Sequence, residues 1–175
     1  MIDARHYQAE ETLRNGLAVC IRAARPDDLE RALDAFRGLE AQTVYFRFFG
    51  PKKEFSAAEI ERFTHMDFRQ RVMLLCTRMQ DGNEIVMASA TYVRLGGAAA
   101  EVAFLVEEDY HRLGIARRML GHLATIASSD GITEFVAEVL PGNSGMLGVF
   151  RACGWPVSLH TEEGVVHVSV DLRGS

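Results

Sequence analysis

The order of apolar and polar positions along the chain indicates an alternation of strands and helices. Six short runs rich in β-branched and other apolar residues are bounded by turn-forming residues, which is the pattern of buried strands. We expect these strands at residues 17–24, 71–77, 84–92, 99–106, 134–140 and 165–172. The turn sequence at residues 80–83 separates the second strand from the third and predicts a hairpin.

Five other segments carry the spacing and the end signals of helices. Pro26, followed by Asp27 and Asp28, suits a first helical turn, and Ser56 with Glu59 three residues later forms a capping box. The longest of these segments has an apolar stripe along one face and is followed by Gly131. The helices are expected at residues 26–37, 41–49, 57–65, 114–129 and 144–152.

The two ends of the chain differ in character. Residues 1–16 are polar and acidic and read as a weakly helical or mobile N-terminal extension that ends at Gly16. Residues 17–175 form the domain, because a chain of 175 residues suffices for one core and hardly for two. The order strand, helices, three strands, helix, strand, helix, strand predicts a single mixed domain of the α/β (α+β) class.

Composition and charge exclude several classes of function. The net charge of −5 leaves no basic surface for nucleic acid. No apolar run approaches the roughly 20 residues that span a membrane, and the N-terminus has no signal-peptide core, so a cytoplasmic location is expected. The three cysteines and six histidines show no ligand spacing, and we expect no metal.

The segment that follows the strand at residues 99–106 is the sharpest chemical feature. It leads through Arg112 and Leu113 to Gly114, where the longest helix opens with Ile115 and the small Ala116. A helix N-terminus carries unpaired N–H groups and partial positive charge, and Gly114 lets a phosphate approach the backbone closely. The arginines at 112, 117 and 118 can add charge-assisted bonds. An equally open interpretation is that the small residues only let this helix pack on its strand.

In this context the chain resembles a known family. Residues 110–120 resemble the GNAT acetyltransferase signature, Gln/Arg-x-x-Gly-x-Gly/Ala, and Asn143, Met146, Phe150, Gly154 and Trp155 follow the order of that superfamily's second motif. A narrower likeness, to the bacterial protein lysine acetyltransferases, is carried by residues 25–28, 45–49, 51–53 and 100–104. Two positions depart from the family pattern. His111 replaces the usual Gln or Arg, and Phe150 replaces the Tyr that many members use as a general acid.

The resemblance implies the fold and the cofactor. It implies a mixed, mostly antiparallel central sheet flanked by helices, with acetyl-CoA between two central strands that diverge. Backbone groups at 104–106 would then bind the pantetheine arm, the loop would bind the diphosphate, and Asn143 would contact the arm or simply cap a helix. The candidate cofactor-binding residues are Phe104, Leu105, Val106, His111, Arg112, Leu113, Gly114, Ile115, Ala116, Arg117, Asn143, Met146 and Phe150.

Acetyl transfer to an amine depends on a base more than on an acid. A lysine-like amine costs about 4–5 kcal/mol to deprotonate at pH 7, whereas the leaving thiolate faces a deficit of only about 2 kcal/mol. Glu101, early in the strand that leads to the loop, is the candidate base, and the family likeness also places a catalytic glutamate there. Glu138 is the second candidate for the base, and we interpret Glu107 and Glu108 as part of a solvated acidic turn.

The acceptor is less tightly specified than the donor. The favoured partner is a lysine ε-amine on a protein, and a small-molecule amine remains an alternative. A non-catalytic acetyl-CoA-binding regulatory module is a third reading, from a different class. The sequence does not fix the oligomeric state or the acyl chain length. Relatives of the resembled group often carry a regulatory domain, for which 175 residues leave no room, so control would come from a partner or from acetyl-CoA supply.

Overall fold

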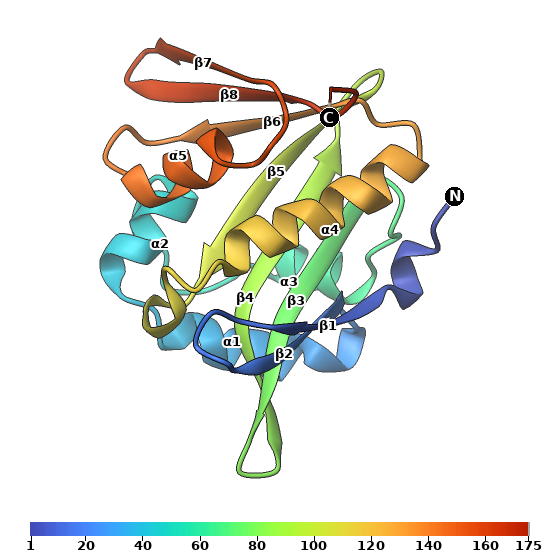
Figure 1. The fold of residues 1–175 in the computed structure, drawn as a ribbon. Coiled ribbons are helices and arrows are strands. Elements are labelled where there is room, and N and C mark those ends of the chain that lie inside the picture. The colour runs from blue at the N-terminus through green and yellow to red at the C-terminus, as the bar shows by residue number, and fades with distance from the viewer. Residues whose placement is uncertain (175) are drawn as a thin grey trace.

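An eight-stranded sheet forms the centre of the computed structural model, which describes residues 1–174 (Figure 1). The strand order is β1-β2-β3-β4-β5-β6-β8-β7, and every neighbouring pair is antiparallel except β5 and β6. The strands are β1 (Gln8–Thr12), β2 (Ala18–Ala23), β3 (Arg71–Gln80), β4 (Asn83–Arg94), β5 (Ala99–Val106), β6 (Glu134–Val139), β7 (Val157–Glu162) and β8 (Val165–Asp171).

Helices cover both faces of this sheet. The helix α4, which carries the long apolar stripe, crosses one face over β3, β4 and β5. In Figure 1, α1 and α3 lie behind the sheet, and α2 lies to its left and contacts β5. The helices are α1 (Leu29–Arg37), α2 (Ala41–Phe48), α3 (Ala57–Thr64), α4 (Ile115–Ser129) and α5 (Ser144–Arg151). The mixed, mostly antiparallel α+β architecture expected from the sequence is confirmed.

Two strands were not foreseen, and both are edge strands. Residues 8–12 were expected to be weakly helical or mobile, but they form β1 and pair with β2 in register from Gln8↔Arg22 to Thr12↔Ala18. Residues 157–162 form β7, which pairs only with β8 and is almost entirely exposed. Whether residues 1–16 behave as an extension separable from the rest of the domain stays a prediction.

A buried group of charges fixes the start of α1. Residues 26–28 form a 3-10 turn and the α-helix begins at Leu29, three residues later than the sequence predicts. Asp28 is fully buried, and both of its oxygens accept hydrogen bonds from Arg22 at 2.8 Å. The same guanidinium contacts Glu84 on β4 at 3.1 Å. The network therefore ties β2 and β4 to the first turn of α1.

The N-terminal strand is fastened to α4 by a second polar network. Glu11 accepts from Arg118 at 2.6 Å and from the Nε2 of His122 at 2.8 Å. The other ring nitrogen of His122 lies 2.5 Å from the Tyr7 hydroxyl. Hydrogen bonds to His122 and Arg118 outweigh burial and hold the pKa of Glu11 below its usual range. Strand β1 is thus joined to the sheet on one side and to α4 on the other.

Candidate functional site

The parallel strands β5 and β6 pair over only three residues and then separate. Their register covers Ala99↔Glu134, Ala100↔Phe135 and Glu101↔Val136 and ends there. On its other side β5 stays paired with β4 as far as Val106. Figure 1 shows β6 diverging from β5. The second half of β5 therefore has a sheet partner on one side only.

This separation leaves main-chain groups of β5 without a strand partner. The N–H of Glu107 donates to the carbonyl of Met87 on β4 at 3.0 Å. Because successive residues of a strand direct their main-chain groups to opposite edges, those of Phe104 and Val106 point toward the gap. The Val106 carbonyl accepts a bond from the Nε2 of His111 at 2.8 Å. The side chain of His111 thus closes the end of the open edge.

A cleft of about 710 Å³ runs along this open edge to the start of α4. Its walls come from β5, β6, the loop before α4, α5 and one side of α2. It brings together twelve of the thirteen candidate cofactor-binding residues, namely Phe104, Leu105, Val106, His111, Arg112, Gly114, Ile115, Ala116, Arg117, Asn143, Met146 and Phe150. Leu113 is the exception, because its side chain packs against the hydrophobic core instead.

The loop before α4 has the geometry of an anion site. Arg112 and Gly114 both have a left-handed backbone, with φ of 66° and 84°, and no side chain caps the helix at Gly114. The first intrahelical bond runs from the N–H of Arg118 to the carbonyl of Gly114. The amides of residues 115–117 therefore have no acceptor within the helix, and they lie at one end of the cleft.

Two side chains at the opposite wall have defined roles in the local structure. The Oδ1 of Asn143 accepts from the N–H of Met146 at 3.2 Å, so this residue does cap α5, while its Nδ2 has no partner among residues 1–174. Phe150 is 1% exposed and packs edge-on against Phe104, with ring centroids 6.1 Å apart. An apolar wall therefore stands at the position where the resembled family pattern led us to consider a tyrosine hydroxyl.

Glu101 lies at the point where β5 and β6 separate. It is the last residue of the β5–β6 register, and its side chain is exposed and lies outside the walls of the cleft. Strand alternation puts it on the same face as Ala103 and Leu105, which face α1, α2 and α3 rather than α4. The candidate base therefore sits at the narrow end of the gap, on the face opposite α4.

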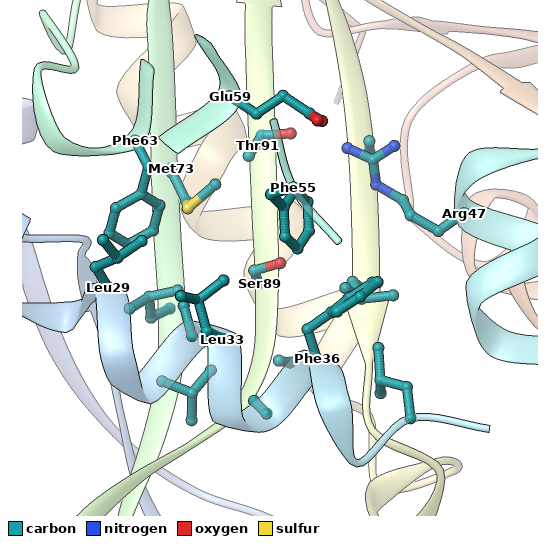
Figure 2. A pocket seen from close by; sticks show the side chains of 18 of the residues that line it. Leu29, Leu33, Phe36, Arg47, Phe55, Glu59, Phe63, Met73, Ser89 and Thr91 are labelled. Atoms are coloured by element: carbon teal, nitrogen blue, oxygen red, sulfur yellow. The ribbon is translucent and has the colours of Figure 1, made fainter. Parts of the chain in front are cut away.

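A second, smaller cavity of about 200 Å³ lies on that face (Figure 2). Aromatic and aliphatic side chains of α1 and α3 face Ser89 and Thr91 of β4 across it. Arg47 reaches in from α2 and lines both this cavity and the cleft. Burial lowers the pKa of its guanidinium, and the nearby Glu101 carboxylate opposes that shift. Arg47 thus marks the junction of the two spaces.

Sequence reasoning missed an acidic group in this cavity. Glu107, expected on a solvated turn, is half-buried and lines the smaller cavity, and burial raises its pKa. Its neighbour Glu108 is not solvated either, because one carboxylate oxygen accepts from the N–H of Glu40 and the other is buried without a partner among residues 1–174. The run of three acids gave no sign that the first two turn inward.

The helices and the ligand-type side chains of residues 1–174 bear on two further possibilities, membrane insertion and metal binding. None of the helices there combines the length and apolar character needed to cross a bilayer. No group of three or more His, Cys, Asp or Glu side chains in the same residues is placed to hold a metal ion.

The separated strands, the uncapped helix start and the cleft that joins them are arranged as the acetyltransferase resemblance of the sequence implies. A model described as "Acetyltransferase (GNAT) family" matches residues 35–155, more than half of the chain. The chain therefore belongs to the GNAT acetyltransferase family. Membership of this family implies acetyl-CoA as the cosubstrate.

Individual members of the family are similar to this chain over most of its length. Acetyltransferase Pat of Mycolicibacterium smegmatis is 32% identical over 162 residues, which are 91% of this chain and 47% of that protein. The GNAT domain of S. lividans PAT superposes with a TM-score of 0.85 at 35% identity, covering 94% of this chain and 96% of that one. A cAMP-binding acyltransferase from Mycobacterium smegmatis gives 0.67 at 27% identity, covering 97% and 48%.

These matches confirm the resemblance to the bacterial lysine acetyltransferases that the sequence indicated. The chain spans about half the length of the curated Mycolicibacterium relative.

Proposed function

We propose that this chain transfers acetyl from acetyl-CoA directly to a primary amine, and that the amine is a lysine ε-amine on a protein. One observation carries the proposal. The open edge of β5 and the uncapped start of α4 line a single cleft of about 710 Å³, which suits a long ligand with a diphosphate at one end.

The proposed cofactor contacts follow the cleft. Amides of residues 115–117 bind the diphosphate, and Gly114 keeps the backbone accessible, since no Cβ stands there. The pantetheine arm runs along β5 and pairs with the free main-chain groups of Phe104, as a neighbouring strand would, and the N–H of Val106 stays available for the reacting carbonyl. The Nδ2 of Asn143 faces the same arm from the opposite wall.

Acetyl-CoA supplies the thioester, and this chain supplies proton removal and stabilisation of charge. Glu101 accepts the amine proton, directly or through a water, as the amine attacks. The N–H of Val106 faces the gap and stabilises the developing oxyanion. Phe150 cannot donate a proton, but the thiolate is a good enough leaving group that the deficit is only about 2 kcal/mol at pH 7.

The smaller cavity supports a lysine acceptor. Its apolar walls suit the methylene stem of a lysine, and the carboxylate of Glu107 on its lining can accept a hydrogen bond from the amine. The likeness to S. lividans PAT and to Pat of Mycolicibacterium smegmatis favours a protein as the bearer of that lysine.

Mass spectrometry of a cell extract incubated with the protein and acetyl-CoA tests this proposal. New acetyl-lysine sites on proteins are the expected result, and Glu101→Gln should produce far fewer of them. Glu107→Gln and Glu138→Gln serve as parallel variants, because each removes one carboxylate from the lining of a different space.

The same experiment separates the competing functions. Acetylated polyamines, amino acids or aminoglycosides without acetylated proteins would indicate a small-amine acetyltransferase. If no acetylated product appeared although a calorimetric titration showed tight coenzyme A binding, the result would indicate a regulatory module. Equal product from wild type and Glu101→Gln would remove Glu101 from the mechanism, and a loss confined to Glu107→Gln would transfer the role of base to that residue.

A further inference from the structure

The turn between β1 and β2 lies against the loop before α4, although 98 residues separate the two along the chain. The Nη1 of Arg14 donates to the carbonyl of Arg112 at 3.3 Å. A Cβ added at Gly114 would lie 3.6 Å from the Nε of Arg14 and 3.7 Å from its Nη2. Arg14 also lines the 710 Å³ cleft. The N-terminal hairpin therefore delivers a guanidinium to the helix start.

This guanidinium is exposed, but the turn that carries it is well anchored. The preceding residue, Leu13, is 3% exposed and its N–H donates to the carbonyl of Leu17 at 2.9 Å. The side chain of Asn15 accepts from the N–H of Leu17 at 3.1 Å. Three residues before Arg14, Glu11 on β1 is bound to α4 through Arg118. The position of Arg14 thus follows from the fold and not from a mobile tail.

The unused donors of Arg14 suit a phosphate. Nη1 is occupied by the Arg112 carbonyl, which leaves the edge formed by Nε and Nη2, and this edge lies beside Gly114. Two parallel N–H groups on one edge match two oxygens of a phosphate. Arg118, in the first turn of α4, does not line the cleft and is bound to Glu11 instead. Arg14 stands where the sequence alone places one of the loop arginines.

We infer that Arg14 binds the diphosphate of coenzyme A side-on, together with the amides at the start of α4, so that the N-terminal hairpin forms part of the cofactor site. The inference rests on the proposed function, because it assigns a further residue to the same cleft. It also gives the β1 strand and its links to α4 a function, since they hold Arg14 against the loop.

Calorimetric titration of coenzyme A into wild type, Arg14→Gln and Arg14→Lys tests the inference without any turnover. Loss of an exposed charge-assisted pair should raise the Kd for coenzyme A about tenfold in Arg14→Gln. Arg14→Lys keeps the charge and should recover part of the affinity. Arg69→Gln removes the same charge from an exposed residue that lines neither cavity and should bind as wild type does.

Two further measurements identify which phosphate group Arg14 contacts. The Arg14→Gln change should weaken the binding of 3′-dephospho-coenzyme A by the same factor as that of coenzyme A, because both ligands carry the diphosphate and differ only in the 3′-phosphate. The affinity of wild type should fall more steeply with added salt than that of Arg14→Gln, which a purely structural role for the side chain would not produce.

Three results would overturn the inference. Binding of coenzyme A by Arg14→Gln within about twofold of wild type would show that the guanidinium makes no contact. A loss seen with coenzyme A but not with its dephospho form would move the contact to the 3′-phosphate. No binding by wild type would reject the proposed function as well, whereas the first two results leave that function standing.

Discussion

The buried aspartate before α1 allows a sharp test of what holds the helix in place. In Asp28→Asn one carboxylate oxygen becomes an NH₂ group that faces the Nη groups of Arg22, which are themselves donors. The variant loses the negative charge and one of the two 2.8 Å bonds from Arg22, while its remaining oxygen still accepts from the other guanidinium nitrogen. Arg22 is 4% exposed, so water does not compensate for the loss.

The expected cost follows from this geometry. Removing one partner of a buried ion pair costs about 3–5 kcal/mol. Glu84 still contacts the Arg22 guanidinium at 3.1 Å, which places the cost near the lower end, at about 3 kcal/mol. For a domain of this size that corresponds to a fall in Tm of about 6–12 °C. Burial alone would raise the pKa of Asp28, but the bonds from Arg22 and Arg25 outweigh it and hold the pKa low, so the wild-type group is charged at pH 7.

Urea unfolding followed by circular dichroism, with Asp27→Asn as the matched control, measures this effect. The side chain of Asp27 is 77% exposed and lies 3.6 Å from Arg25, so its replacement should change stability by less than about 0.5 kcal/mol. If Asp28→Asn lost less than about 1 kcal/mol, or no more than the Asp27 variant, the ion pair would not be what anchors α1.

The remaining predictions concern the helix start and the N-terminal network. Gly114→Ala forces a side chain into a left-handed backbone with φ of 84° at a cost of about 1–2 kcal/mol. Its Cβ would also stand 3.6 Å from Arg14, and we expect coenzyme A affinity measured by calorimetry to fall at least tenfold, while the control Gly121→Ala, at a helical position with open space, leaves it unchanged. Unaltered binding by Gly114→Ala would contradict the phosphate loop. Glu11→Gln removes the negative charge and one of the two oxygens that accept from His122 and Arg118, and it should lower stability at pH 7 by about 1 kcal/mol. Because the folded pKa of Glu11 lies below its unfolded value, this stabilisation is complete above that value and disappears as the pH falls through the folded pKa. Urea midpoints of both proteins should therefore converge in acid, and a constant difference at all pH values would refute the assignment.

The sequence predicted the interior of the fold better than its edges. Buried strands such as β5 carry continuous apolar runs, and their positions follow from composition alone. Strands β1 and β7 carry mostly polar side chains that face water, and only their hydrogen bonds to β2 and β8 make them strands. A segment whose structure depends on its neighbours gives little signal in its own residues.

The candidate site divides in the same way. Twelve cofactor candidates meet in one cleft because they belong to two local motifs, each contained in a short stretch of chain. Arg14 and Glu107 could not be found by spacing. The first reaches the loop across 98 residues, and the second turns inward from an acidic run that looks solvated. Glu101 was placed on the correct strand, but the sequence could not tell which face of the sheet it occupies.

Because the β5–β6 ladder ends early, main-chain donors and acceptors of β5 remain unpaired inside the sheet. In most sheets such unpaired groups occur only on the outermost strands. An exposed strand edge can pair with the edge of another chain. In this protein the two outer strands, β1 and β7, carry mostly polar and charged side chains, which disfavour such pairing. The unpaired edge of β5 is protected from such pairing in another way, because the cleft walls formed by β6, α5 and the loop before α4 flank it. The protein can thus keep donors and acceptors ready for a ligand while limiting the risk of aggregation.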